Sequence, residues 1–118
     1  MRNYKDNAIV AMSFQFALDI VDYAELLMEQ KRFVFANQLL RSGCSIGANA
    51  KEAQGAESKA DFIHKMKIAY KEAEESEYWL ELCESAKNFP KTGKLLSDIE
   101  SILRVLGKII STSKTNGK

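Results

Sequence analysis

Apolar residues recur at spacings of three and four along most of the chain, which is the period of an amphipathic α-helix. The clearest rows are Ile9, Met12, Phe16, Ile20, Tyr23 and Leu27, then Phe62, Met66, Ala69, Ala73, Ser76, Leu80 and Cys83, and last Leu95, Ile99, Ile102, Leu106 and Ile109. No segment shows the alternation of apolar and polar residues that is typical of a half-buried strand. The pattern therefore predicts an all-α protein.

Breaks between these rows divide the chain into four expected helices. Pro90, the only proline, disfavours helix at the residue before it, and Gly55 is expected to follow a helix end. Ser58, followed by Asp61 three residues later, resembles a capping box that opens the next helix. The expected helices span roughly residues 7–29, 32–54, 58–87 and 92–112, and the polar tail from Ser111 onward is expected to fray.

Short connections between the helices favour an antiparallel up-down-up-down four-helix bundle, formed by residues 1–118 as one domain. The apolar coverage is wider than one bundle core needs. A second row on the first helix comprises Val10, Phe14, Leu18, Val21 and Met28, and the last helix adds Leu96, Leu103 and Ile110. Because no helix of a four-helix bundle is central, this excess predicts self-association into a symmetric ring or dimer. The alternative is one broad, well-buried face.

The second expected helix is rich in small and polar residues. Gly43 and Gly47 lie one turn apart, and each costs about 1 kcal/mol relative to alanine in a helix interior. A close approach of two helices would offset this cost, so both glycines are candidate packing or assembly residues. A polar row beside them comprises Ser42, Ser45, Asn49 and Glu52. This row is either a solvated face or a stripe that lines a subunit contact or a central channel.

Charge is distributed unevenly, although the formal net charge of the chain is only +1. Residues 72–86 contain six glutamates and no lysine or arginine, and Tyr78 and Trp79 lie among these acids. Large aromatic residues among charges are typical of protein contacts. We therefore expect Tyr78 and Trp79 in a subunit contact whose acids meet basic residues of a neighbouring copy.

Positive charge is concentrated in two other segments. Residues 31–71 carry eight basic residues against three acidic ones, and residues 87–118 carry seven against two. In an up-down bundle, much of this charge would gather at the pole that holds the termini and the second loop. The candidate nucleic-acid contacts there are Lys51, Lys59, Lys65, Lys67, Arg104 and Lys108, with Arg2, Lys5 and Lys114 beside them. Phosphate contacts need clustered positive charge without base-specific geometry. The alternative is an ordinary dipolar surface.

The composition bears on membranes and secretion. With 46% hydrophobic and 28% charged residues, the chain has an ordinary soluble composition and lacks an apolar run long enough to span a bilayer. The N-terminal residues lack a secretory signal, so a cytoplasmic protein without a membrane partner is expected. Cys44 and Cys83 are far apart in the sequence, and both are expected to be buried and reduced.

The sequence offers little support for catalytic or metal chemistry. A di-metal bundle would use Glu-x-x-His on two helices, but His64 is the only histidine. One histidine among many serines does not define a catalytic triad, and a helical GxxxG cannot present the backbone amides of a phosphate-binding loop. We therefore expect a protein that is not an enzyme, with no catalytic residue, metal or cofactor, and with His64 at the surface or an interface.

Residues 41–86, RSGCSIGANAKEAQGAESKADFIHKMKIAYKEAEESEYWLELCESA, resemble the four-helix bundle family first named for proteins encoded in intervening sequences of bacterial 23S rRNA genes. The family pattern reads Arg-Ser-x-x-Ser-Ile-x-x-Asn, then Glu with a small residue, then Ser-x-x-(Asp/Glu)-Phe and a Glu-rich helix with a Trp-Leu end. The matching residues are Arg41, Ser42, Ser45, Ile46, Asn49, Glu52, Ala53, Ser58, Asp61, Phe62, Ile68, Ala69, Glu72, Trp79 and Leu80. The chain departs from the pattern at Ala50, usually a larger aliphatic residue, and at Cys44, frequently Thr or Ser.

This resemblance implies a bundle that assembles into a homopentameric barrel, in a family whose function is mostly unassigned. A related group, the accessory variability proteins of diversity-generating retroelements, is implicated in binding nucleic acid and a reverse transcriptase, but its members are typically much more basic. We therefore expect a non-catalytic homo-oligomer with an assembly or adaptor role. The alternative is a ribosome- or retroelement-associated protein that binds RNA, DNA or a nucleic-acid-associated partner through a basic pole.

Overall fold

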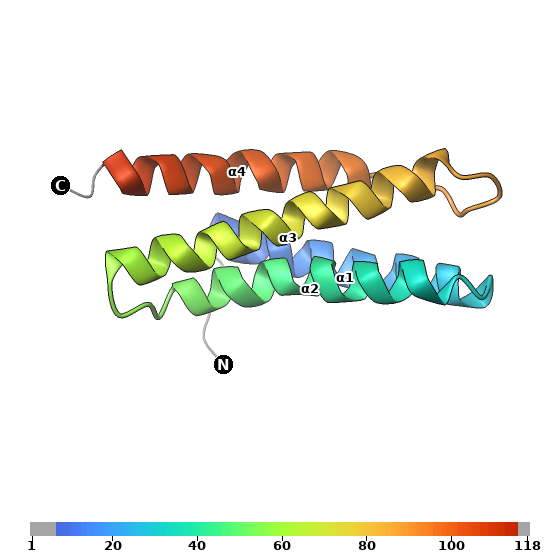
Figure 1. Ribbon diagram of the computed structural model, residues 1–118, viewed down its shortest axis with the longest axis horizontal. Helices are drawn as coiled ribbons and strands as arrows, with labels where there is room; N and C mark the ends of the chain where they lie inside the picture. The colour runs from blue at the N-terminus through green and yellow to red at the C-terminus, as the bar shows by residue number, and fades with distance from the viewer. Residues whose placement is uncertain (1–6, 116–118) are drawn as a thin grey trace.

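The computed structural model describes residues 7–115, and these residues form four helices and no strand. The helices are α1 (Ala8–Glu29), α2 (Phe33–Ala53), α3 (Lys59–Ser85) and α4 (Leu95–Thr115). They lie alongside one another in an elongated body of 51 × 30 × 21 Å (Figure 1). The prediction of an all-α protein with four helices is confirmed.

Each helix packs against two others in a closed cycle. Within the described chain, α1 contacts α2, α2 contacts α3, α3 contacts α4 and α4 contacts α1, with no close backbone approach across either diagonal. The α1–α2 and α3–α4 loops lie at one end of the molecule, and the α2–α3 loop lies at the other end (Figure 1). The α1–α2 pair therefore forms one side of the bundle, and the α3–α4 pair forms the opposite side.

The core lies between the helices and takes residues from all four of them. Its largest fully buried apolar side chains are Phe16, Ile20, Leu27, Leu39, Ile46, Met66, Leu80, Ile99, Ile102 and Leu106. Most of them belong to the rows of spacing three and four that the sequence shows. The periodicity therefore identifies the inward face of each helix.

Two helix ends show what the local sequence determines. Ser58 Oγ accepts the Asp61 backbone N–H at 3.0 Å, and the Asp61 carboxylate accepts the Glu57 N–H at 3.4 Å, so the predicted capping at α3 is confirmed.

After α1, Lys31 takes a left-handed φ of +61°, which the sequence did not predict. The Lys31 N–H bonds to Met28 O at 2.8 Å and the next N–H bonds to Leu27 O at 2.9 Å, which is a Schellman motif without glycine.

The last helix begins and ends later than expected. The Glu84 carboxylate accepts the Thr92 N–H at 3.2 Å and the Thr92 hydroxyl at 2.7 Å, and Gly93 has a left-handed φ of +59°. These contacts keep the segment before Leu95 out of α4. At the other end the chain stays helical to Thr115, whose hydroxyl donates to Ser111 O at 3.0 Å. The expectation that the tail frays from Ser111 is therefore wrong for residues 111–115, and residues 116–118 lie outside the described part of the chain.

Candidate functional site

The two glycines of α2 lie at the seam between α1 and α2. A Cβ added at Gly43 would lie 3.1 Å from both Cγ atoms of Ile20, and one added at Gly47 would lie 3.3 Å from Ser13 Oγ. Ser13 is fully buried, and its hydroxyl donates to Ile9 O at 2.7 Å. The glycines therefore allow the close helix packing that their spacing predicts, and this contact lies within one chain.

Exposed and mostly apolar side chains flank this seam on the outside. On α1, Phe14, Leu18 and Val21 are 66%, 47% and 39% exposed and follow one another at helical spacing. On α2, a stripe without charged residues has one polar member, Asn37, and comprises Phe33, Asn37, Leu40, Cys44 and Ala48, all exposed or half-buried. We call these eight residues the α1–α2 face. Exposed apolar surface of this kind is typical of an interaction site.

The sequence predicted this face only in part. Of the second apolar row on α1, Val10 is buried and Met28 is half-buried, so the exposed part is Phe14 to Val21. The α2 stripe was missed, although its spacings of four, three, four and four were a readable signal. The amide of Asn37 interrupts the apolar pattern of that stripe, which makes the signal weaker than the rows that form the core.

The two cysteines lie in different environments. Cys83 is buried as expected, and this burial raises the pKa of its thiol. The prediction that Cys44 is buried is wrong, because Cys44 follows Gly43 by one position and therefore points outward from the seam. The exposed thiol belongs to the α1–α2 face.

The predicted polar row of α2 divides into residues with different roles. Ser42 is fully buried, donates to Gln38 O at 2.9 Å and accepts the Ser76 hydroxyl of α3 at 2.9 Å. Ser45 and Asn49 are half-buried and donate to backbone carbonyls one turn earlier on α2. Glu52 is exposed and pairs with Lys65 at 3.7 Å. Ser42 therefore belongs to the α2–α3 contact and not to a solvated or channel-lining stripe.

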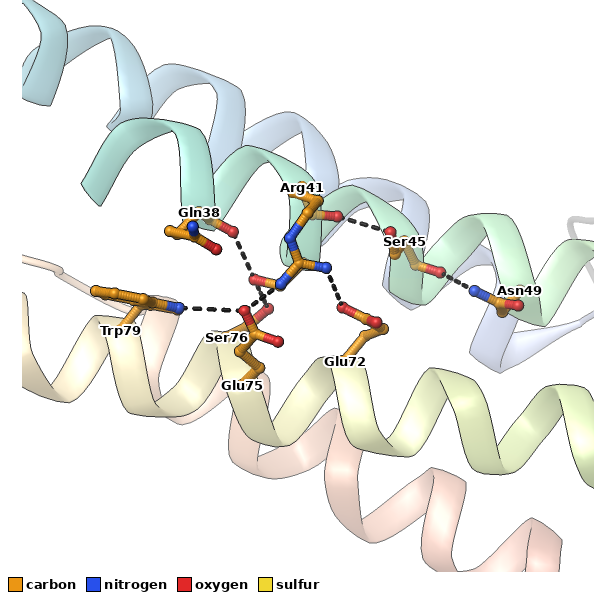
Figure 2. A network of polar contacts seen from close by, with 9 residues as sticks. Gln38, Arg41, Ser45, Asn49, Glu72, Glu75, Ser76 and Trp79 are labelled. Carbon is orange, nitrogen blue, oxygen red and sulfur yellow. Dashed lines mark hydrogen bonds and ion pairs between the residues drawn. The ribbon is translucent and has the colours of Figure 1, made fainter. Parts of the chain in front are cut away.

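Arg41 joins α2 to α3 beside this serine pair. Its guanidinium pairs with Glu72 at 3.1 Å and with Glu75, and Trp79 Nε1 donates to the Glu75 carboxylate at 3.3 Å (Figure 2). The hydrogen bond from Arg41, assisted by that from Trp79, lowers the pKa of Glu75. The expectation that these acids meet basic residues of a neighbouring copy is therefore wrong for Glu72 and Glu75, whose partner is in the same chain.

The aromatic pair of α3 lies at the edge of a second apolar patch. Trp79 is half-buried and packs edge-on against Phe35 of α2 at 5.6 Å between ring centroids. Tyr78 is 56% exposed, and Leu82, one turn further on, is also exposed, as is Val34 beside Phe35. We call Val34, Tyr78, Trp79 and Leu82 the α2–α3 patch. A contact of this patch with another subunit stays a prediction.

The candidate nucleic-acid contacts have different surroundings. Lys65 is engaged by Glu52 and Asp61, whereas Lys67 lies beside Lys114 in a groove between α3 and α4. The remaining four are exposed and lie outside that groove: Lys51, Lys59, Arg104 and Lys108. Arg2 and Lys5 fall outside the described residues, and His64 is exposed.

The described part of the chain contains neither a metal cluster nor a membrane-spanning helix. Among residues 7–115, no three His, Cys, Asp or Glu side chains are placed to share a metal ion. None of the described helices is long and apolar enough to cross a bilayer.

Comparison with known proteins now identifies the family. A family model described as 23S rRNA-intervening sequence protein matches residues 5–108. The chain belongs to this family. A crystal structure of a protein of unknown function from the S23 ribosomal protein family of Bacteroides thetaiotaomicron is similar, with a TM-score of 0.80 and 46% identity over 86% of this chain and 97% of that one. No curated protein matches.

The residues that carry the family pattern hold α2 and α3 together. Arg41 and Glu72 clamp α2 to α3, Ser42 pairs with Ser76 across the same contact, and Ser58 caps α3. The pattern therefore describes the α2–α3 contact more than any reactive site. The α1–α2 face contains Cys44, one of the positions at which the chain departs from the pattern.

Proposed function

We propose that the protein is a non-catalytic, cytoplasmic assembly or adaptor protein, an antiparallel bundle whose copies associate through the α1–α2 face. The observation that carries this proposal is the charge-free stripe on α2 together with the exposed Phe14, Leu18 and Val21 of α1. Apolar surface of this extent stays in water only at a free-energy cost, because each Å² that is buried contributes roughly 25 cal/mol. A second copy of the same chain would remove that surface from water.

A ring is favoured over a twofold dimer by the presence of two different patches. A twofold contact pairs one patch with itself, whereas a ring pairs one patch with a different patch of the next copy. The α1–α2 face and the α2–α3 patch lie on neighbouring sides of one subunit, since both include residues of α2. The homopentamer that the family resemblance implies is therefore the oligomer that we propose.

A second candidate function is binding of RNA or DNA through the basic pole. The observation that favours it is the proximity of Lys67 and Lys114 in the α3–α4 groove, of which only Lys67 is among the six residues that the sequence nominated. Ribosome or retroelement association belongs to this candidate and not to the first one.

Alkylation of Cys44 tests the first proposal directly. Cys44 is exposed in the isolated subunit and Cys83 is buried, so an assembled ring should protect both thiols from iodoacetamide. Partial burial raises the pKa of Cys44, so the reaction is best run at mildly alkaline pH, where the thiolate forms. Site-resolved mass spectrometry should show slow labelling of Cys44 at high protein concentration and faster labelling on dilution, with Cys83 unlabelled throughout.

The same experiment includes a control and an outcome that would contradict the proposed assembly. Unfolding in denaturant should make both cysteines react, which verifies that the reagent is in excess. Labelling of Cys44 at the rate of a free thiol at every protein concentration would contradict assembly through the α1–α2 face.

A further inference from the structure

A shallow groove of about 630 Å³ runs between α3 and α4, on the opposite side of the bundle from the α1–α2 face. Lys67 and Lys71 line it from α3 and Lys114 lines it from α4, against one acidic side chain, Glu74. Gly107 also lines the groove, and a Cβ added there would lie 3.6 Å from Tyr70 Cε2. The groove is within the size range of small-molecule sites and is far larger than a single inorganic ion.

The positive charge in this groove is only partly offset by the protein, because three lysines face one glutamate. None of Lys67, Lys71 and Lys114 forms an ion pair with another residue in the described part of the chain. Lys114 instead lowers the pKa of Lys67, first through side-chain contact and then through like-charge repulsion. A bound anion would accept hydrogen bonds from both ammonium groups and would remove their repulsion.

The other residues that line the groove indicate which chemical groups the anion has besides its charge. Tyr70 and Ile110 supply apolar surface, and Ser111 and Thr115 supply hydroxyl groups beside Lys114. A bare phosphate would leave the apolar walls without contact. A nucleotide would place its phosphate at the lysines and its ribose or base against Tyr70, since base–aromatic contacts are favourable for every base.

We propose that the α3–α4 groove binds the phosphate group of a nucleotide, either free or within a single-stranded RNA, through Lys67, Lys71 and Lys114. This assignment deepens the nucleic-acid candidate and rests on it for the RNA form of the ligand, but it does not depend on self-association. Because the groove lies opposite the α1–α2 face, assembly through that face leaves it open to ligand.

The test measures two probes against a charge-matched pair of variants. Fluorescence anisotropy follows a labelled single-stranded RNA, and isothermal titration calorimetry follows ATP, each at several salt concentrations. Lys67→Gln/Lys114→Gln removes two charges from the groove. Lys87→Gln/Lys91→Gln removes two charges from exposed positions in the α3–α4 loop, at the other end of the molecule.

We expect the groove variant to weaken binding about tenfold and the loop variant to change it less than about twofold. For RNA, the groove variant loses two phosphate contacts, and each contact to a single strand releases roughly 0.7 of a counterion. The slope of log affinity against log salt should therefore fall in magnitude by about 1.4. Binding of ATP as well as RNA would identify a nucleotide site, and binding of RNA alone would identify a strand site. Either outcome supports the groove.

Two results would overturn the assignment: no binding of either probe at low salt, or equal weakening by the two double variants, which would indicate an unspecific charge effect. Light scattering on the same samples separates this inference from the proposed assembly. If the groove variant loses binding while the mass of its oligomer stays the same, the loss is specific to the groove. If the mass of the oligomer changes, the result concerns assembly through the α1–α2 face.

Discussion

Replacing both Phe14 and Leu18 with aspartate should convert the protein into monomers of 13.3 kDa. Both side chains are largely exposed in the subunit, so the change leaves the core intact. In the assembly, each aspartate would bring an unpaired carboxylate into an apolar contact, which costs several kcal/mol per buried charge. Because every ring contains several such contacts, the free-energy penalty is incurred several times, and dissociation should be complete at micromolar protein concentrations.

Helix α1 offers a matched control for this change. Leu18 is 47% exposed and Leu26 is 46% exposed, and both are leucines on the same helix. Leu26, however, follows Asp19 and Asp22 at helical spacing, on a polar side of α1 away from Phe14. Leu18→Asp alone should weaken the oligomer and Leu26→Asp should leave its mass unchanged. Retention of the full oligomer by the Phe14/Leu18 double variant would mean that the copies meet elsewhere.

Gly43→Ala should lower the free energy of unfolding by about 1 kcal/mol, even though alanine is the better helix former. The added methyl would lie 3.1 Å from two carbon atoms of Ile20, which is fully buried and would have to shift by a few tenths of an ångström. Overpacking of this kind typically costs about 2 kcal/mol, and subtracting the helix-propensity gain of about 1 kcal/mol leaves the expected loss.

Gly107→Ala is the matched substitution on α4. Its methyl would lie at an ordinary contact distance of 3.6 Å from Tyr70 Cε2, so only the propensity gain remains. This variant should be more stable by about 0.5–1 kcal/mol, and the two variants should differ by about 2 kcal/mol in urea unfolding. Both must be measured at one protein concentration, because association raises apparent stability. Equal effects of the two substitutions would show that the α1–α2 seam is not tightly packed.

The sequence was most informative where structure depends on neighbouring residues. Apolar spacing predicted four helices and their inward faces, and the Ser58–Asp61 pair predicted the start of α3. Both signals act over one or two helical turns, so they can be read without a partner element. The left-handed turn at Lys31 carries no glycine signal and was missed for that reason.

The candidate site was less predictable because its residues meet across long sequence distances. The sequence left open whether the row that contains Ser42 was solvated or lined a subunit contact or channel, but the Ser42 hydroxyl accepts a hydrogen bond from Ser76 of α3. Arg41 likewise pairs with acids of α3 in the same chain rather than with those of another copy. Lys114 was placed in a fraying tail, although the helix extends far enough to bring it to Lys67. Helical periodicity gives the direction of a side chain around its helix, but it does not identify the element that covers it.

Light scattering of the unmodified protein across a range of concentrations tests the central claim of assembly most directly. The account predicts a mass of five subunits of 13.3 kDa each at high protein concentration, with dissociation only on strong dilution. A mass of one subunit at every concentration would contradict it, because the α1–α2 face would then remain in water with no second copy to cover it.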